Sequence, residues 1–565
     1  MKYVRPILFA ILSFSMMLAQ GQTQISLVNS RPMLMSGGEP MLVLGGELGN
    51  STATCIEDID TNISKAKQGN LNTILVPAYW ELIEPHEGKF DFALIDHVID
   101  KAKENNLKVG FLWFGAWKNS MSCYAPEWVK RDYKKYPRAK TSDGKPLEIL
   151  SAFSEAVARA DSKAFEALLK HIKEKDKQGS VIMIQVENEI GMLEDARDYS
   201  EAANEEYAKG VPKELMQYIS KHRDNLHESL AGKWKENGNK STGSWKDVFG
   251  NDVYTDEYFM AWNYARYVER LASKGKKILP AVYYVNAALN SRGRKPGEYP
   301  SAGPLAHLKD IWHAAAPSVD FLSPDIYDSG FEDWTTQYAL EDNLLFIPEV
   351  KRTSDNVAQA YYVFGHHNAL GISPFSIENG DTTYFGKLSA AYSVLCELTP
   401  IFAKQESGLM RDGVILSYDK PSIALFDDST RITLSHYFTL PWDPRASSKD
   451  NWNKAGAIIM KISPDEYILA GSGIVAKFEH IDETQNVQEL GEDGFAASGG
   501  KSMTAASSGH TPRIGLAKVE EVRINPDGSF NTIRTFNGDE THQGRHVRID
   551  VDNHKILHIK TYKYQ

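Results

Sequence analysis

The chain has 565 residues, and this length predicts two to four domains rather than one. Its composition, 42% hydrophobic and 24% charged residues, is that of a soluble globular protein. The formal net charge is −11 and Lys and Arg form no run or stripe, which argues against nucleic acids and anionic membrane surfaces as partners because both require clustered positive charge.

The first residues have the pattern of a secretory signal. Lys2 and Arg5 precede an apolar stretch from Pro6 to Ala19, and small and polar residues follow. The stretch is short for a transmembrane helix, which needs about 20 apolar residues, and no later segment approaches that length. We therefore predict a signal peptide over residues 1–21 and export to the periplasm or the exterior, without membrane insertion. An uncleaved anchor is the alternative.

From about residue 40 to residue 400, short apolar runs alternate with helical patterns. Eight runs are typical of strands, and they lie at 41–46, 72–80, 108–114, 181–187, 278–286, 319–327, 343–350 and 369–375. Segments 92–106 and 162–176 have the i, i+3, i+4, i+7 spacing of amphipathic helices. Eight strands that alternate with helices predict an α/β fold, a (β/α)8 TIM barrel, over residues 22–400. Continuous apolar strands suit a parallel sheet that is buried on both faces.

Two segments depart from this alternation. Residues 193–255 form a charged, partly helical insertion, expected on the C-terminal face of the barrel, either as a wall of the cleft or as a contact surface. After residue 400, alternating runs and turn signals such as NPDGS (525–529) predict an all-β, sandwich-like accessory domain over 401–565. Its Gly/Ser/Ala-rich stretch 493–510 is typical of a mobile loop. The domain either binds glycan or caps the barrel.

The sequence predicts no metal or other cofactor. Cys55, Cys123 and Cys396 are isolated, without a C-x-x-C pair or the His spacing of a zinc site, and we interpret them as buried apolar residues. His366 and His367 fall in a predicted helix, where a surface role is expected. A metal hydrolase is therefore disfavoured.

Two predicted strands end in carboxylates. VIMIQVENEIG carries Glu187, Asn188 and Glu189, and FIPEV carries Glu349. A polar loop after a strand explains one such acid, but two at the mouth of one barrel are what glycosidic bond cleavage needs. One carboxyl group must donate a proton to the leaving oxygen, while the other must be ionised to attack the anomeric carbon.

These motifs resemble a known family. Asn-Glu at the end of strand four and Glu at the end of strand seven is the signature of the retaining (β/α)8 glycosidase clan, and QVENEIG resembles the motif of family 35 β-galactosidases within it. PAYWELIEPHEGKFDF (77–92) is similar to that family's strand-two motif. The resemblance spans most of the barrel, and the C-terminal region resembles the accessory domain of a bacterial branch active on xyloglucan side chains. It implies that Glu189 is the acid/base, Glu349 the nucleophile, and Asn188 a ligand of the sugar 2-hydroxyl.

The chain also departs from the family. FGAWKN (114–119) has no carboxylate where better-known members have a Glu that contacts galactose. Glu81 and Ile83 stand where those members tend to have Asn and His. The sugar contacts are therefore partly rebuilt.

Other side chains near the predicted strand ends are candidates for substrate binding, as stacking rings or as partners of hydroxyl groups. With Asn188, they are Tyr79, Glu81, Trp117, Asn119, Asn286 and Tyr327. The alternative is that about half of them pack the barrel. Tyr327 is also expected to keep the nucleophile ionised by hydrogen bonding. Three further acids, Glu47, Asp325 and Glu378, are interpreted as hydrogen-bonding groups, and the alternative is that one of them is the nucleophile.

Taken together, the resemblance implies a retaining exo-β-galactosidase with a carbohydrate substrate. One alternative keeps the mechanism but changes the sugar, to a β-glucoside, β-glucuronide or β-galactofuranoside, or makes the action endo. A non-catalytic carbohydrate-binding protein is the remote alternative. The oligomeric state stays open.

Overall fold

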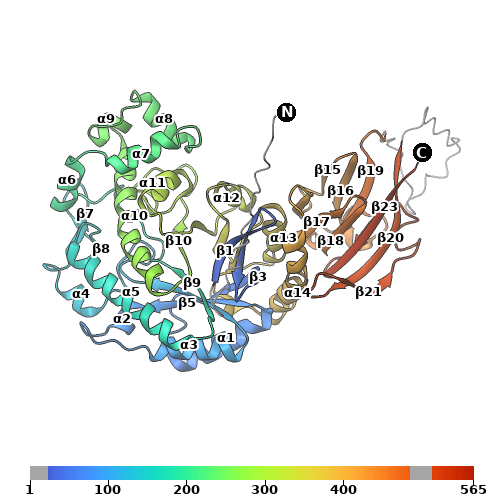
Figure 1. Ribbon diagram of the computed structural model, residues 1–565, viewed down its shortest axis with the longest axis horizontal. Coiled ribbons are helices and arrows are strands. Elements are labelled where there is room, and N and C mark those ends of the chain that lie inside the picture. Colours follow the sequence, from blue (N-terminus) through green and yellow to red (C-terminus); the bar gives the residue numbers. More distant parts are fainter. Residues whose placement is uncertain (1–22, 484–511, 565) are drawn as a thin grey trace, which may run out of the picture.

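The computed structural model describes residues 23–483 and 512–564 of the chain. The predicted signal peptide and the predicted mobile loop at 493–510 lie outside the described residues. A closed barrel of eight parallel strands with surrounding helices is followed by antiparallel sheets, which confirms the predicted fold class (Figure 1).

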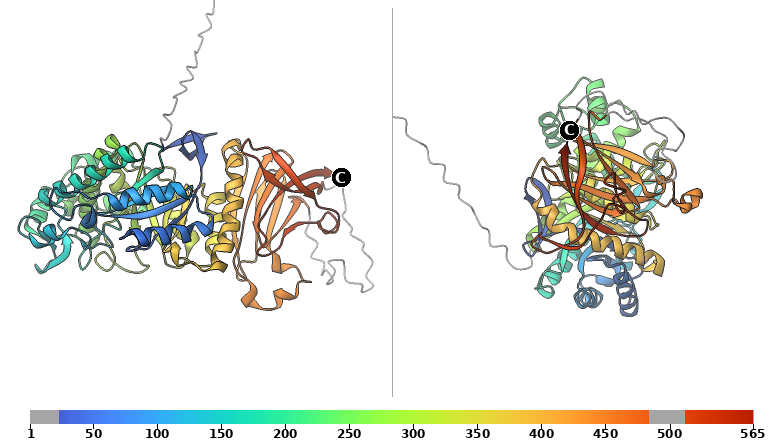
Figure 2. Two further views of the ribbon diagram at one scale, coloured as in Figure 1. Left: turned by 90° about the horizontal axis from the view of Figure 1, so that it is seen from below. Right: turned by 90° about the vertical axis from the view of Figure 1, so that its right-hand side faces the viewer.

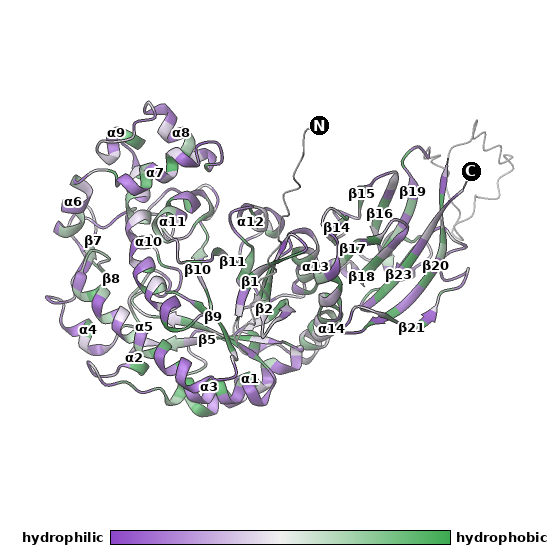
Figure 3. Ribbon diagram, in the orientation of Figure 1, coloured by the Kyte–Doolittle hydropathy of each residue, from purple (hydrophilic) through white to green (hydrophobic). Residues whose placement is uncertain are grey.

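The barrel strands are continuous apolar runs, and each overlaps a predicted run. They are β4 (Val43–Glu47), β5 (Thr73–Tyr79), β6 (Lys108–Phe114), β9 (Val181–Gln185), β10 (Val282–Ala288), β11 (Phe321–Ile326), β12 (Phe346–Val350) and β13 (Gly371–Pro374). Each strand pairs with its neighbour in this order and β13 pairs with β4, so the sheet closes without an edge. Because both faces are covered, the strands are almost entirely buried and hydrophobic (Figure 3).

Amphipathic helices surround the barrel. Most connect successive strands, and these are α1 (Ile56–Ala66), α2 (Trp80–Ile83), α3 (Ala93–Glu104), α4 (Glu127–Arg131), α5 (Glu155–Lys175), α10 (Val253–Ile278), α11 (Lys309–Ala315), α12 (Phe331–Tyr338), α13 (Asn356–His366) and α14 (Thr382–Lys404). The predicted insertion carries four short helices, α6 (Glu201–Ala208), α7 (Lys213–Lys221), α8 (Glu228–Glu236) and α9 (Trp245–Phe249), which lie beyond the rim of the barrel in Figure 1.

Two small sheets were not predicted. β1 (Thr23–Val28), β2 (Arg31–Ser36) and β3 (Glu39–Met41) form an antiparallel meander before the first barrel strand. β7 (Arg138–Lys140) and β8 (Pro146–Leu150) form a hairpin between β6 and α5.

The C-terminal part is a sandwich of two antiparallel sheets. The larger sheet has the order β14 (Arg411–Leu416), β17 (Ala455–Ser463), β18 (Glu466–Ser472), β23 (Lys555–Tyr564), β20 (Arg513–Ile524), β21 (Phe530–Thr535). The smaller sheet has the order β15 (Ser422–Asp427), β16 (Thr430–His436), β19 (Ile474–His480), β22 (Val547–Ile549). Side chains of both sheets, such as Ile432 and Leu469, share one apolar core. The predicted turn at 525–529 connects β20 and β21.

The larger sheet is also packed against the barrel through its other face. Ile458 and Ile468 of that face belong to the apolar core of the barrel, and α13 and α14 lie between the two parts (Figure 2). Main chains approach closely at this interface. A Cβ atom at Gly365 of α13 would lie 2.6 Å from the Cα of Gly413 on β14, so only glycine fits there.

We predict that Gly365→Ala destabilises the protein by about 1–3 kcal/mol, because the new methyl group meets backbone atoms that cannot move aside. Gly386→Ala on the exposed side of α14 is the matched control, since nothing lies within 4 Å of its added methyl group. That change should stabilise the chain by about 0.4–1 kcal/mol. Denaturant unfolding measures both values, and equal values for the two variants would contradict the close packing.

The cysteines correct one prediction. All three are free thiols, but Cys123 and Cys396 are exposed and Cys55 is partly exposed, so they are not the buried apolar residues that we expected. Cys123 lies in a loop and Cys396 on the outer face of α14, where a small side chain meets solvent. Among the described residues, no helix is both long and apolar enough to span a membrane.

Candidate active site

Four carboxyl groups meet at the C-terminal ends of the barrel strands. One carboxyl oxygen from each of Glu189, Asp325 and Glu349 lies within 4.8 Å of the other two. Glu47, the last residue of β4, interacts electrostatically with Glu349 and Glu189. All four side chains are buried, with exposed fractions between 0% and 7%. Sequence reasoning placed the four acids at strand ends, and the closure of the barrel brings them together.

The segment after β9 is held on both sides by its neighbours. The backbone N–H of Glu189 donates to Oδ1 of Asn286 on β10 at 3.0 Å, and that of Asn188 donates to the carbonyl of Trp117 at 3.3 Å. The carbonyl of Glu189 accepts from the backbone N–H of Ser120 at 3.1 Å. Glu189 is therefore fixed by the loop after β6 on one side and by β10 on the other.

This segment has a strained backbone. Glu187 and Glu189 have φ values of +60° and +45°, a region that residues with a side chain rarely adopt, and such strain is concentrated at functional sites. Gly191 follows where two loops approach, because a Cβ there would lie 2.8 Å from Oγ of Ser120 and 2.9 Å from Cβ of Pro300. The ENEIG motif thus combines two strained residues with a glycine that a close contact requires.

A buried pair of carboxyl groups supports the strained turn. Glu187 accepts from the backbone N–H of Trp117 at 2.8 Å, and its carboxyl group interacts with that of Asp161 on α5. Asp161 already accepts from Nε1 of Trp113 at 2.8 Å and from the hydroxyl of Tyr267 at 2.6 Å. Since both oxygens of Asp161 are acceptors, the shared proton lies on Glu187. Burial, and then the charge of Asp161, raises the pKa of Glu187 well above its usual range.

We predict that Glu187→Gln keeps the fold and most of the activity, because its amide can donate to Asp161 and its carbonyl can accept from Trp117. Glu187→Ala leaves both partners unsatisfied, and it should lower the free energy of unfolding by about 2–3 kcal/mol or more. Chemical denaturation at pH 7 measures the difference. Below pH 5 the wild type and Glu187→Gln should have equal free energies of unfolding. As the pH rises, the free energy of unfolding of the wild type should fall relative to that of Glu187→Gln, because the carboxyl group can lose a proton and the amide cannot. Equal damage by Gln and Ala would rule out the shared proton.

Glu349 is surrounded by hydrogen-bond donors. The hydroxyl of Tyr327 donates to Oε2 at 2.6 Å, and Nδ2 of Asn188 lies 3.5 Å from Oε1. Burial, followed by the charge of Glu349, raises the pKa of Tyr327, so the phenol keeps its proton and remains a donor. Hydrogen bonds of this kind favour the ionised form of a carboxyl group. Tyr327 therefore contacts the carboxyl group that we predicted as the nucleophile.

The remaining acids hold protons near neutral pH. Burial, and then the charge of Glu349, raises the pKa of Glu189 to about 7. The same two causes, in the same order, raise the pKa values of Asp325 and Glu47 well above their usual range. Nδ2 of Asn286 donates to Oδ2 of Asp325 at 2.7 Å. The cluster therefore contains carboxyl groups that keep protons near neutral pH beside Glu349, which accepts the hydrogen bond from Tyr327.

The cluster also has the composition of a cation site. Glu189, Asp325 and Glu349 offer only oxygen atoms, the ligands that hard cations such as Mg²⁺ and Ca²⁺ prefer. However, Tyr327 and Asn286 already donate to two of the three groups, and two of the three have raised pKa values. These contacts fit a cluster whose charge is balanced by protons.

Other predicted residues have different positions. Trp117 is fully buried and packs edge to face against Tyr267, so its ring faces are not free for a sugar. Tyr79 is 3% exposed and stacks on Tyr124. The structure does not bring Glu81 into the cluster, because it pairs with Lys130 at 3.3 Å.

Two further predicted residues complete the comparison. Asn119 is exposed in the loop after β6, with φ of +50°. Glu378 accepts hydrogen bonds from the backbone of Gly49 and from the side chains of Ser376 and Asn379, which is the hydrogen-bonding role we expected.

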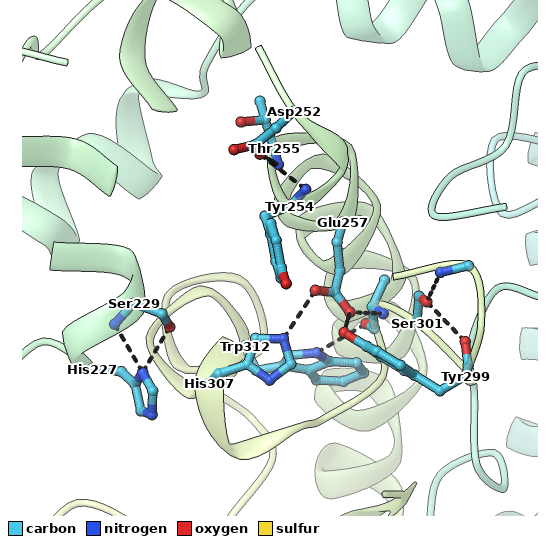
Figure 4. A network of polar contacts seen from close by, with 12 residues as sticks. His227, Ser229, Asp252, Tyr254, Thr255, Glu257, Tyr299, Ser301, His307 and Trp312 are labelled. Atoms are coloured by element: carbon cyan, nitrogen blue, oxygen red, sulfur yellow. Dashed lines mark hydrogen bonds and ion pairs between the residues drawn. The ribbon is translucent and has the colours of Figure 1, made fainter. Parts of the chain in front are cut away.

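A buried carboxylate on α10 holds the loop after β10 (Figure 4). Oε1 of Glu257 accepts from the hydroxyl of Tyr299 at 2.9 Å and from the backbone N–H of Ala302 at 3.2 Å, and Oε2 lies 2.9 Å from Nε2 of His307. Ser301, in the same loop, pairs through its backbone with Met192 just after the ENEIG motif. The loop after β10 is thereby held between α10 and the segment that follows Glu189.

Sequence reasoning missed two contributors. Asp161 lies on the inner face of a helix, and nothing in its sequence neighbourhood connects it to Glu187. Lys118 is 4% exposed in the loop after β6. Its positive charge opposes, without cancelling, the rise in the pKa values of Glu47, Glu189 and Asp325. A lysine within the apolar FGAWKN segment was the available signal.

Comparisons with known proteins divide the chain into two regions. Residues 33–252 match the profile described as Glycosyl hydrolases family 35. Residues 388–548 match the profile described as Domain of unknown function (DUF5597). A comparison with curated proteins gave no match.

Solved structures with similar folds include two β-galactosidases. The enzyme of the Antarctic haloarchaeon Halorubrum lacusprofundi has 13% identity and a TM-score of 0.44, over 63% of this chain and 58% of that one. The enzyme of the psychrophilic Marinomonas ef1 has 11% identity and a TM-score of 0.43, over 64% and 61%. A β-mannanase of the blue mussel Mytilus edulis has 13% identity and a TM-score of 0.37, over 65% and 94%. The chain thus spans less than two thirds of the length of both β-galactosidases.

Proposed function

We propose that this chain is a glycoside hydrolase of family 35 and acts as a retaining exo-β-galactosidase that releases terminal β-D-galactosyl residues from oligo- or polysaccharides. The observation that carries the mechanism is the proximity of Glu189 and Glu349, whose closest oxygens lie within 4.8 Å. Retaining enzymes separate their two carboxyl groups by about 5–5.5 Å, whereas inverting enzymes need about 6.5–9.5 Å to fit a water molecule.

In the first step, Glu349 attacks the anomeric carbon and Glu189 donates its proton to the leaving oxygen. The hydrogen bond from Tyr327 orients Glu349 for the attack. The raised pKa of Glu189, about 7, keeps the proton available at neutral pH. The product of this step is a glycosyl-enzyme and a free alcohol.

In the second step, Glu189 acts as a base. Once Glu349 is esterified, its negative charge is gone, and this charge is the second cause of the raised pKa of Glu189. The pKa of Glu189 therefore falls, and the ionised group can take a proton from the attacking water. The water attacks the anomeric carbon from the face that the leaving group occupied. This attack releases Glu349 from the ester and gives net retention of the anomeric configuration.

The sugar is the less constrained part of the proposal. The family 35 match of residues 33–252 supports galactose. The loop after β6 favours a second candidate, because Ala116 and Lys118 leave no carboxylate where a galactose contact is expected. That candidate is a retaining glycosidase of the same mechanism with another β-linked sugar or with endo action. We also propose that the protein works outside the cytoplasm.

Initial rates of wild type and Glu349→Gln on a panel of aryl β-glycosides test the nucleophile and the sugar together. We expect hydrolysis of the galactopyranoside by wild type, with a loss of at least about 10⁴-fold in Glu349→Gln, because an amide cannot attack. Proton NMR of the first product should show the β-anomer before mutarotation.

The other outcomes of this experiment are distinct. Turnover of a different glycoside, lost in Glu349→Gln, would keep the mechanism and replace the sugar. Activity that survives in Glu349→Gln would contradict the assignment of the nucleophile. An α-anomer as first product would contradict retention.

The acid/base role predicts a dependence on pH and on the leaving group. Because Glu189 must be protonated in the first step, kcat/KM should fall as the pH rises through about 7. Glu189→Gln should lose about 10²–10⁴-fold on a substrate with a poor leaving group and much less on a dinitrophenyl glycoside, which leaves without protonation. Equal losses on both substrates, or an unchanged alkaline limb, would exclude Glu189 as the acid.

A further inference from the structure

Asp325 is a third carboxyl group beside the two catalytic ones, and double displacement gives it no role. It lies on β11, and its backbone pairs in register with that of Glu349 on β12. Residues paired in this way on parallel strands point to the same face of the sheet, here the inside of the barrel. One oxygen of Asp325 lies within 4.8 Å of an oxygen of Glu189 and of an oxygen of Glu349. Asp325 therefore faces the space in which the glycosidic bond is cleaved.

Asn286 fixes the orientation of the Asp325 carboxyl group. Its Nδ2 donates to Oδ2 of Asp325 at 2.7 Å, while its own Oδ1 accepts from the backbone N–H of Glu189 at 3.0 Å. Among the described residues, no N–H group and no alcohol or phenol hydroxyl donates to the second oxygen of Asp325, Oδ1, although this atom is buried. Buried oxygen atoms nearly always accept a hydrogen bond. Oδ1 is thus the atom of Asp325 that a bound ligand can use.

The direction from which Asp325 approaches the sugar differs from that of the missing carboxylate. Ala116 and Lys118 occupy the loop after β6, where a galactose contact is expected. In the closed barrel order that begins at β4, β6 is the third strand and β11 the sixth, so the two strands lie on different sides of the barrel. A carboxyl group on β11 therefore contacts other atoms of the sugar than a carboxylate in the loop after β6 would.

We propose that Asp325 is a sugar-contacting residue that accepts a hydrogen bond at Oδ1 from a hydroxyl group close to the anomeric carbon, and that this contact helps to determine which sugars the site accepts. The inference rests on the proposed function, because Glu189 and Glu349 flank the anomeric carbon only if they are the acid/base and the nucleophile. In a hexopyranoside, this carbon has the 2-hydroxyl on one side and, beyond the ring oxygen, the 6-hydroxyl on the other. These are the two hydroxyl groups that a side chain beside both catalytic groups can contact.

The test combines variants of Asp325 with deoxy substrates. We expect Asp325→Ala to lower kcat/KM about 10²-fold on nitrophenyl β-D-galactopyranoside, because a hydrogen bond to the sugar is lost. On either the 2-deoxy or the 6-deoxy analogue the loss should shrink to less than about threefold, because the partner hydroxyl is already absent there. On the 3- and 4-deoxy analogues the full loss should remain. If another aryl glycoside is the better substrate, the deoxy series is that of its sugar.

Asp325→Asn tests the contact without leaving a cavity. Its amide oxygen can still accept from Asn286, but an NH2 group replaces Oδ1, so the same pattern across the deoxy series is expected. Asp320→Asn is the matched control. Asp320 immediately precedes β11 at the opposite end of the barrel, where it accepts from the backbone N–H of Tyr283 at 2.8 Å and pairs with Lys276. Its kcat/KM values should equal those of wild type on every substrate.

Three results would overturn the proposal. An equal loss on all substrates would assign Asp325 to structure, to the balance of charge or to the chemical step itself. A loss that disappears on the 3- or 4-deoxy analogue would place the contact away from the anomeric carbon. Wild-type activity in both Asp325 variants would show that no contact is made.

Binding without turnover separates this inference from the proposed function. Calorimetric titration with methyl 1-thio-β-D-galactopyranoside should give a Kd about tenfold higher in Asp325→Ala than in wild type. For the thioglycoside that lacks the partner hydroxyl, the two Kd values should be equal. If Glu349→Gln retains activity, the catalytic assignment fails, while the Kd values still decide whether Asp325 contacts the sugar: equal ratios for all thioglycosides would exclude the contact.

Discussion

Four carboxyl groups in one buried space cannot all be ionised, and the rest of the site is arranged around this constraint. Glu189, Asp325 and Glu349 lie within 4.8 Å of one another, and Glu47 interacts electrostatically with two of them. Repulsion and burial force some of these groups to keep protons near neutral pH. In the proposed mechanism an acid and a nucleophile of the same chemical type thereby coexist, and their neighbours distinguish the two groups.

Hydrogen bonds distinguish these carboxyl groups from one another. Tyr327 donates to Glu349, while Asn286 both accepts from the backbone N–H of Glu189 and donates to Asp325. Below them, Glu187 and Asp161 share a proton that supports a strained turn. The same physical device, a carboxyl group made neutral by burial, thus serves the backbone as well as the chemistry.

The barrel and its two principal acids were predictable because each depends on a local pattern. Eight apolar runs mark the strands, and Glu189 and Glu349 end two of them, so closure of the sheet brings them together. The contacts between elements were not predictable. Asp161 meets Glu187 across the space between a helix and a strand end, and Trp117 lies in the predicted loop but turns its ring into the packing around Tyr267. The cysteines were misread because their types predict burial, whereas Cys123 and Cys396 occupy a loop and an outer helix face.

The contact between the barrel and the sandwich limits how the C-terminal domain can act. α13 follows directly from β12, which carries Glu349, and its main chain touches that of β14 at Gly365 and Gly413. A domain on a flexible linker samples many distances from a catalytic centre and raises the local concentration of whatever it holds. This domain instead lies at a fixed distance and orientation from the carboxyl cluster. Any molecule that binds to its outer surface would therefore be held at one fixed position relative to the barrel.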